Sequence, residues 1–513
     1  MSGATGPLPC PATPHWFHIP FSDVPDAERV VALFRQLGAG DVTPQPTRIL
    51  TAYDSADRRL AGLELGLIQA ATDLRCIHAG GWDEAPWNTA VGPIPARDLP
   101  KSLAERLGEQ LGDRLLLPLG AVRIDTWTGT MPGPDADVPL IATILRADEE
   151  RWAGILEVDA PASLPFPSAL AAILQQAGLV PSDRHPLLAF IDQLVGSYPR
   201  IPAMPAFTDT AEPALIAMRR LVAGCLVRLR LLEPGIIDDL DPSFLHQYRV
   251  TLRTTRSLCK LMAEVFDEAT ALRLKADLGD LARAGNLLRD LDVHLVEDDD
   301  TVVGLPSHAS DGLPFLINHL SSRRQEAQRQ LAARLRSPEH AAHLDDLERL
   351  VHGSGAEGAG PAALLPIAGV VRDAGWRAWR AVRRRSRSID AETGDDEIHI
   401  LRIRVKRLRY LLDVFGRLVA PPDEILRLQE RLKDLQAVLG DYNDTVNQLR
   451  LMLDLGRASD LPAQAVFTVG LMAGVLSSRR HEGRAELKRQ LGQATGKSVR
   501  RAYERCFGPD GVH

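Results

Sequence analysis

Two stretches of the chain repeat one pattern: HQYRVTLRTTRSLCKLM at residues 246–262 and HILRIRVKRLRYLLDVF at residues 399–415. Each begins with a histidine and places Arg or Lys at the third, seventh and tenth positions after it. These positions share one face of an α-helix, because 3.6 residues complete a turn. The pattern therefore predicts two helices, each with a basic stripe about 15 Å long. The stripes consist of His246, Arg249, Arg253, Arg256, His399, Arg402, Lys406 and Arg409.

The stripes predict an anionic ligand. Like charges on one helix face repel and destabilise an isolated helix, and this chain carries that cost twice, 153 residues apart. The alternative is a solvated basic face paired with acids of neighbouring helices. Candidate acids for such pairs are Asp290, Asp292, Asp441 and Asp444. We expect some of the arginines to be engaged in this way, since a carboxylate that orients an arginine also preorganises an anion site.

The two histidines admit several interpretations. Each can contact the anion, donating a hydrogen bond when neutral and adding charge when protonated, below about pH 6.5. A phosphorelay role would need one exposed histidine rather than two within arginine stripes. Metal binding is disfavoured, because neither histidine belongs to the Glu-x-x-His spacing of metal sites in helical bundles. The remaining alternative is a structural hydrogen bond to a neighbouring helix.

Composition narrows the class of protein. The 513 residues have 45% hydrophobic and 25% charged side chains, as is usual for globular chains. We find no apolar run long enough for a membrane span and no signal-peptide pattern at the N-terminus, so we expect a cytoplasmic protein. Five scattered cysteines without a CxxC pair argue against a disulfide framework and a zinc site. Residues 201–513 contain 45 Lys and Arg against 43 Asp and Glu, so an anion site there requires local clustering.

The pattern of turns and periodicity predicts two domains. Short β-like runs such as 48–52, 120–126 and 152–158 alternate with Gly, Pro and Asp in residues 1–198. A proline-rich linker at 199–212 precedes long amphipathic segments at 213–507. We expect four helices in each of two repeats, 213–352 and 362–507, joined by a Gly-rich segment. A second marker supports the duplication, because Arg289-Asp290 and Asn443-Asp444 stand 154 residues apart.

The helical half resembles the conserved histidine α-helical domain family, called CHAD. The resemblance rests on the two stripe segments and on LLRDLDV (287–293) and LQAVLGDYND (435–444). It implies an all-α domain of two four-helix bundles related by pseudo-two-fold symmetry. It also implies a basic surface that binds inorganic polyphosphate, and a location on cytoplasmic polyphosphate granules.

Arginine suits such a ligand, because its planar guanidinium donates two parallel hydrogen bonds to one phosphoryl group. A row of cations at one-turn intervals would follow successive phosphates, with an affinity that falls steeply with salt. We predict that residues beside the stripes contribute as well: Lys260, Tyr410, Arg219, Arg383, Arg384 and Arg387.

The segments ILTAYDSADRRLAGLELGL (49–67) and ILEVDAPASLPFPSALAAILQQAGLVPSD (155–183) resemble the CYTH family. That likeness implies an α+β domain with an antiparallel β tunnel, which in the family hydrolyses triphosphates with a divalent metal. The chain departs from the family motifs: it has HWFHI (15–19) in place of ExExK, and LGLIQ (65–69) in place of Arg-x-Arg. We could assemble no set of carboxylates for a metal. We therefore interpret the domain as a degenerate tunnel fold without catalytic or metal-binding residues.

Three functions follow as hypotheses. The first is a non-catalytic polyphosphate-binding protein, because no nucleophile, Gly-rich phosphate loop or metal cluster stands near the stripes. The second is a CYTH-type metal-dependent triphosphatase or polyphosphatase. The third, a nucleic-acid binder, is disfavoured because the stripes lack interleaved aromatic residues for base stacking. We expect no cofactor and no membrane partner, while other polyanions remain candidate ligands. The sequence does not reveal the oligomeric state.

Overall fold

A computed structural model describes residues 15–508 except 22–23, 56–58, 79–80, 112–113, 133–136, 159–173, 175, 183–185, 193, 195–200, 303–310, 354, 391, 458–460 and 495. The chain forms two compact units, Met1–Ile201 and Pro202–His513. Each unit is described by itself below.

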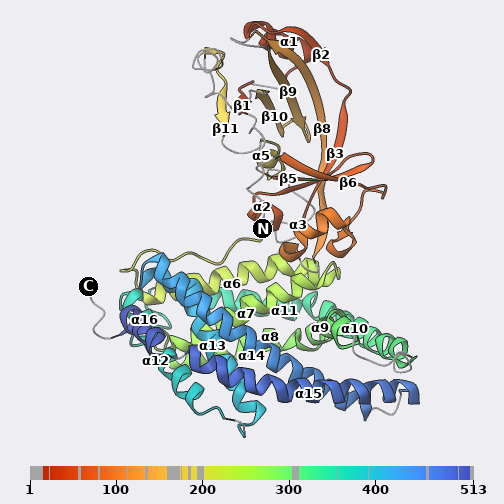
Figure 1. Cartoon of the computed structure of the whole chain (residues 1–513). Coiled ribbons are helices and arrows are strands. Elements are labelled where there is room, and N and C mark those ends of the chain that lie inside the picture. Colours follow the sequence, from red (N-terminus) through yellow and green to blue (C-terminus); the bar gives the residue numbers. More distant parts are fainter. Residues whose placement is uncertain are drawn as a thin grey trace, which may run out of the picture. The chain divides into compact units, whose positions relative to one another are not determined.

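The first unit is built on one antiparallel sheet (Figure 1). Its strands follow the order β11-β1-β10-β9-β8-β3-β4-β5-β6, and β2 and β7 also pair with the long strand β8. No pairing among the described residues joins β11 to β6, so the sheet is not closed. The predicted antiparallel sheet is confirmed, whereas closure into a tunnel is not shown. The strands are β1 (His15–Ile19), β2 (Gly40–Pro44), β3 (Arg48–Ser55), β4 (Gly66–Gln69), β5 (Asp73–His78), β6 (Gly81–Pro86), β7 (Ile94–Pro95), β8 (Leu115–Met131), β9 (Val138–Arg146), β10 (Trp152–Val158) and β11 (Val180–Ser182).

Helices cover the apolar parts of this sheet. They are α1 (Ala27–Gln36), α2 (Arg59–Gly62), α3 (Lys101–Leu111) and α5 (Pro186–Ile191). Helix α1 begins where the Asp26 carboxylate accepts a hydrogen bond from the backbone N–H of Arg29, at 2.9 Å. Its buried Phe34 packs over β8 at Gly129, where an added Cβ would lie 2.9 Å from the phenyl ring. The glycine thus allows the helix to approach the sheet closely.

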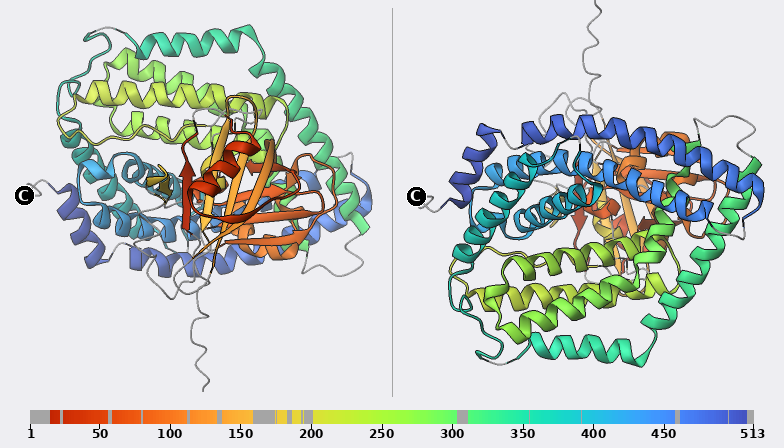
Figure 2. Two further views of the ribbon diagram at one scale, coloured as in Figure 1. Left: turned by 90° about the horizontal axis from the view of Figure 1, so that it is seen from above. Right: turned by 90° about the horizontal axis from the view of Figure 1, so that it is seen from below.

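The second unit is all-α, as predicted. Its first half contains α6 (Ala214–Ile237), α7 (Pro242–Leu261), α8 (Glu268–Ala284), α9 (Asn286–Val302), α10 (Leu313–Leu335) and α11 (Pro338–Val351). Its second half contains α12 (Ile367–Arg387), α13 (Asp395–Phe415), α14 (Pro422–Gly456), α15 (Ala463–Ala494) and α16 (Lys497–Phe507). Figure 2 shows the helices of the two halves as two groups lying side by side.

The two halves share one helix order but divide it differently. The third helix expected in each half is the single 35-residue α14 in the second half and the pair α8 and α9 in the first. The break falls at Gly285, where an added Cβ would lie 2.7 Å from Leu245 Cδ1. The expected fourth helix is divided in both halves: α11 begins after Ser337 and α16 begins after Gly496.

Backbone hydrogen bonds relate the halves by a local two-fold axis. The N–H of Ala214 donates to the carbonyl of Leu365 at 3.0 Å, and the N–H of Ile367 donates to the carbonyl of Glu212 at 2.9 Å. Each bond is the image of the other after a shift of 153 residues. The bridge between Pro213 and Pro366, the N-caps of α6 and α12, lies between them. The duplication predicted from the stripes is therefore present in the backbone.

Candidate anion-binding groove

The stripe helices α7 and α13 pack against each other, and both line one cavity of about 1490 Å³. Residues of α8, α9 and α14 complete its walls. Its lining includes eleven Arg and Lys side chains but only five Asp and Glu, so it carries an excess of positive charge. We call this cavity the groove.

Apolar packing orients the first stripe toward the groove. Helix α7 begins at Asp241, whose carboxylate accepts a hydrogen bond from the N–H of Ser243 at 2.6 Å, and Pro242 occupies its first turn. Tyr248 and Leu252 are buried on the core face of the helix. Because the remaining face must turn outward, the basic side chains at one-turn intervals are left to line the groove.

The structure brings together most of the predicted site residues. Those that line the groove are His246, Arg249, Arg253, Arg256, Lys260, His399, Arg402, Lys406 and Tyr410. Tyr410 is 8% exposed and its side chain lies in the wall of the groove. Side chains from both repeats therefore face one common space, as the duplicated pattern suggested.

Arg409 does not line the groove. Its Nη1 donates to Gln436 Oε1 of α14 at 2.7 Å, and its Nε lies 3.3 Å from Asp413 Oδ2. The equivalent pair in the first half is Arg256 and Lys260, which repel each other and both line the groove. An acid at one position thus withdraws Arg409 from the second stripe.

The flanking arginines also lie elsewhere. Arg219 donates to the carbonyl oxygens of Gly355 at 3.2 Å and Glu357 at 2.5 Å, and so fastens the Gly-rich join between the halves. Arg383, Arg384 and Arg387 lie on α12 outside the groove lining. These four residues precede the stripe helices in sequence but do not line the groove.

Mutual repulsion is strongest at the centre of the groove. Arg253 and Lys406 occupy equivalent positions of the two stripes. Burial, together with the positive charges of Arg402 and Arg253, lowers the pKa of Lys406 to about 7. Burial and the neighbouring Arg253 lower the pKa of Arg249 to about 10. The groove therefore holds its cations at an electrostatic cost that an anion would relieve.

Two donors in the groove are buried and unsatisfied. The Nε atoms of Arg253 and Arg402 are shielded from solvent and have no hydrogen-bond partner among the described residues. A buried donor without an acceptor costs about 1–3 kcal/mol. Arg402 approaches one acid through its other nitrogens, with Nη2 3.5 Å from Asp444 Oδ1. Both side chains are thus positioned to donate to a bound anion.

The acids proposed as arginine partners have different roles. Asp444 pairs with Arg402 as expected, and Asp290 lines the groove near Arg249, where burial raises the pKa of its carboxyl. Asp292 instead accepts from Arg324 Nε at 2.9 Å, behind the groove. Asp441 is exposed on α14. One of the four therefore makes an ion pair with a stripe residue.

His399 is held by a specific hydrogen bond. Its Nδ1 lies 2.5 Å from Asn443 Oδ1, a residue of the second duplicated marker. Because an amide oxygen only accepts, Nδ1 carries the proton, and Nε2 of the neutral ring is an acceptor. His399 would then donate to an anion through Nε2 only after protonation, in contrast to the neutral donor considered from sequence. His246 is exposed and lines the groove from α7.

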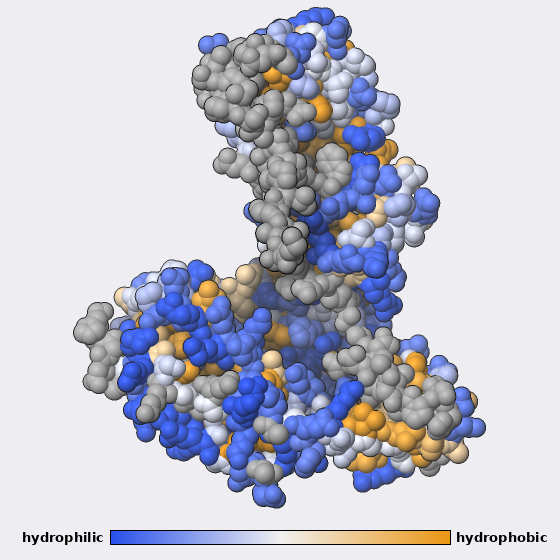
Figure 3. Space-filling model, in the orientation of Figure 1, coloured by the Kyte–Doolittle hydropathy of each residue, from blue (hydrophilic) through white to orange (hydrophobic). Residues whose placement is uncertain are grey.

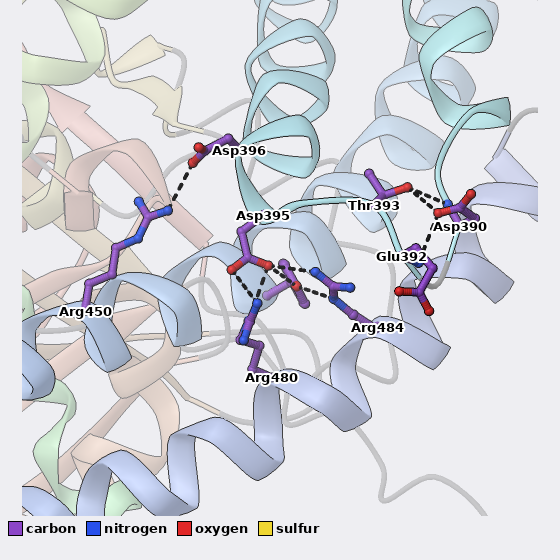
Figure 4. Close-up of polar contacts among 9 residues, drawn as sticks. Asp390, Glu392, Thr393, Asp395, Asp396, Arg450, Arg480 and Arg484 are labelled. Atoms are coloured by element: carbon purple, nitrogen blue, oxygen red, sulfur yellow. Dashed lines mark hydrogen bonds and ion pairs between the residues drawn. The ribbon is translucent and has the colours of Figure 1, made fainter.

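A polar cluster anchors this end of α13 (Figure 4). Asp395, in the first turn of α13, accepts hydrogen bonds from Tyr442 Oη at 2.7 Å and Arg484 Nη2 at 3.0 Å. Arg480 of α15 lies 2.8 Å from the other carboxylate oxygen. The cluster ties α13 to α14 and α15, and so fixes the register that places His399 beside Asn443.

Five further cations line the groove that the repeated pattern did not predict. They are Lys275, Arg289, Arg323, Arg407 and Arg450. Four come from helices other than α7 and α13, so only the tertiary fold reveals them. Arg407 is on α13 but outside the repeated spacing, and its pKa is lowered by burial and by Arg404 and Arg256.

The first unit shows no comparable cluster among its described residues. The segment LGLIQ (65–69) is mostly buried, with Leu67 fully covered, and Gln69 accepts a hydrogen bond from Tyr53 at 2.7 Å. HWFHI forms β1, which pairs with β10 and β11. Arg123 is engaged by Asp125 at 2.9 Å. Arg58 and Asp159, charged residues of the two segments that resemble the CYTH family, lie outside the described residues.

Within the described part of the chain, no group of three or more His, Cys, Asp or Glu side chains is arranged to hold a metal ion. No helix in that part combines the length and apolarity needed to cross a bilayer.

Fold and groove together define a duplicated, all-α domain with a basic groove at its centre. The model of the CHAD domain family matches residues 220–453. The helical unit of this chain is therefore a CHAD domain.

Two relatives align with a longer part of the chain than the family model does. Two uncharacterized proteins of Mycobacterium tuberculosis, MT2285 of strain CDC 1551 / Oshkosh and Rv2226 of strain ATCC 25618 / H37Rv, are each 25% identical over 372 residues. These alignments cover 69% of this chain and 67% of each relative.

Solved structures also match. The CHAD domain from the plant Ricinus communis has 22% identity and a TM-score of 0.48, covering 58% of this chain and 97% of its own. PptA from Streptomyces chartreusis has 15% identity and a TM-score of 0.42, covering 56% of this chain and 99% of its own.

Proposed function

We propose that the CHAD domain binds inorganic polyphosphate in the groove and performs no chemistry on it. One observation carries the proposal: cations of both repeats converge on a single cavity, where the buried Nε atoms of Arg253 and Arg402 lack acceptors. A chain of phosphates supplies acceptors and negative charge at regular intervals. It would relieve the repulsion between Arg253 and Lys406 and release bound counterions.

Replacing both central cations tests the proposal. The full-length Arg253→Gln/Lys406→Gln variant should bind long-chain polyphosphate at least about 100-fold more weakly, because two charge-assisted hydrogen bonds are lost and each contributes roughly 1.5–3 kcal/mol. Fluorescence anisotropy with labelled polyphosphate, over a series of salt concentrations, measures both the affinity and its salt dependence. Wild-type affinity should fall steeply as salt rises.

The control is Arg329→Gln on α10. Arg329 is exposed and pairs only with Glu326, one turn away, so this variant removes a positive charge without altering the groove. It should bind as the wild type does. Equal affinity of the groove variant and the control would refute the proposal. Equal competition by single-stranded nucleic acid of the same charge would instead favour a general polyanion site.

We also propose that this binding places the protein on polyphosphate granules. A fluorescently tagged wild-type chain should then co-localise with granules in cells, and the Arg253→Gln/Lys406→Gln variant should be dispersed. Granule localisation of both proteins would contradict the idea that the groove makes the attachment.

We propose that the first unit is a degenerate CYTH-like domain. Support comes from the antiparallel sheet and from the apolar segment 65–69 where the family has Arg-x-Arg. The competing hypothesis is a metal-dependent triphosphatase. Phosphate release from tripolyphosphate by the purified full-length protein, with Mg²⁺ or Mn²⁺ present, would establish that activity and contradict the non-catalytic assignment.

A further inference from the structure

The two halves differ in how they neutralise one duplicated arginine. Arg230 on α6 and Arg383 on α12 are equivalent, 153 residues apart. In each half, the last helix packs against the helix that carries this arginine, α11 against α6 and α16 against α12. The side chains presented there differ in charge: α11 offers the two acids Asp345 and Glu348, whereas α16 offers Arg500 and Glu504, which pair with each other.

In the first half the arginine is fully paired. Arg230 Nη2 lies 2.5 Å from Asp345 Oδ1, and its Nε lies 3.3 Å from Glu348 Oε1. Both acids lie on α11, directly after the buried Leu344 and Leu347. The two carboxylates together outweigh the guanidinium charge and leave no positive charge for an anionic ligand.

In the second half the corresponding arginine faces other cations. Directly after the buried Val499 and Tyr503 of α16 come Arg500 and Glu504. Glu504 is engaged by Arg500 at 2.5 Å. Burial and the charges of Arg387 and Arg500 lower the pKa of Arg383, while the charge of Glu504 opposes this shift.

Arg384 and Arg387, which lie beside Arg383 on α12, are also unpaired among the described residues. Arg383, Arg384 and Arg387 make no ion pair or hydrogen bond through their side chains with any described residue, and the Nε of Arg383 is buried without an acceptor. The nearest acid in the following loop, Asp390, accepts instead from Thr393 Oγ1 at 2.7 Å and from the N–H of Glu392 at 3.1 Å. We call Arg383, Arg384, Arg387 and Arg500 the α12–α16 patch. The surface over these helices is mostly hydrophilic (Figure 3).

Basic side chains also run from the groove toward α12. Arg407 lines the groove, and its charge interacts with that of Arg404, three residues earlier on α13. Arg404 Nη1 in turn donates to the carbonyl of Ala381 on α12, at 3.3 Å. The cations of α13 thus connect the groove with the helix that carries the patch.

We propose that the α12–α16 patch is a second phosphate-binding site, which takes the part of a long polyphosphate chain that extends beyond the groove. This inference rests on the proposed function of the groove. It assigns the preference for long chains to the second half alone. In the first half, Asp345 and Glu348 pair with Arg230 and so prevent the equivalent position from binding phosphate.

The test compares tripolyphosphate with long-chain polyphosphate on the full-length protein. The Arg383→Gln/Arg384→Gln/Arg387→Gln variant should lose about tenfold in affinity for long chains, since exposed charge pairs contribute roughly 1.5- to 5-fold each. Its affinity for tripolyphosphate should match that of the wild type. A second variant, Arg500→Asp, places an acid near Arg383, as Asp345 lies near Arg230 in the first half. It should have the same selective effect.

Arg230→Gln is the matched control, because it alters the equivalent residue of the closed half. It should leave the affinity for both ligands unchanged, with folding checked by thermal denaturation. Unchanged long-chain affinity in both patch variants would overturn the second site while leaving the groove intact. Failure of the wild type to bind either ligand would instead overturn the proposed function.

Discussion

Single residues decide how charge is distributed in the groove. Asp413 withdraws Arg409, whereas Lys260 at the equivalent position leaves Arg256 in the lining. The spacing of the stripes is the same in both repeats, so spacing alone did not distinguish these two arginines. The side chain one turn further along the helix made the difference.

Lys406 should make polyphosphate binding depend on pH. Its pKa is about 7, lowered by burial and by Arg402 and Arg253, while Asp444 opposes and Arg409 adds to the shift. A bound polyanion favours the charged ammonium, so affinity should be higher at pH 6 than at pH 8, with proton uptake on binding. Calorimetry in buffers of different ionisation enthalpy measures that uptake.

The Lys406→Arg variant separates this effect from the titration of the ends of the ligand. Arginine stays charged throughout this range, so the variant should lose most of the pH dependence. An unchanged pH dependence would exclude Lys406 as its source. For the free protein, the unfolded state binds more protons between pH 7 and 10.5. The free energy of unfolding should therefore rise with pH over that range through this residue.

At the scale of helices, the cluster at the start of α13 should contribute to stability. Asp395→Asn leaves Arg480 and Arg484 without a charged partner in a half-buried site, which should lower the free energy of unfolding by about 1–3 kcal/mol. Chemical denaturation measures this change. Asp396→Asn is the matched control, because Asp396 is exposed and pairs only with Arg450, at 3.0 Å.

The contribution of Asp395 should also disappear in acid. Burial opposes ionisation of this carboxyl, but hydrogen bonds from Tyr442, Arg484 and Arg480 outweigh it, and its pKa is lowered. A carboxyl with a lowered pKa stabilises the fold above its ordinary pKa and loses that effect as pH falls. The stability difference between wild type and Asp395→Asn should therefore shrink toward low pH. A constant difference would contradict this assignment.

Local signals in the sequence predicted the helices and their basic faces where such signals determine them. Asp241-Pro242 marks the start of α7, and the repeated spacing identified the groove residues of both stripes. Local signals did not reveal the break at Gly285, which depends on the close approach of Leu245. They also did not show that Arg219 and Arg383 lie outside the groove lining, since the position of one helix around another is set by packing across the whole domain.

At the scale of the whole molecule, each half completes the other. The start of α6 donates to a carbonyl of the join before α12, and the start of α12 donates to a carbonyl of the segment before α6. Two chains cut in the Gly-rich join, 1–353 and 354–513, should therefore associate when produced together. Co-purification of an untagged half with a tagged half, followed by polyphosphate binding, measures the reassembly. Recovery of the tagged half alone would show that the covalent join is required.

The reciprocal bonds around Pro213 and Pro366 bear on the ancestry of the domain. A shorter ancestral gene encoding one half would have offered the same edges to a second copy, and so would have formed a symmetric homodimer. In such a dimer, positions 253 and 406 would have held one and the same residue in the two copies. Fusion of two gene copies removed that constraint, and side chains such as Asp413, which stands where the first half has Lys260, then became specific to one side.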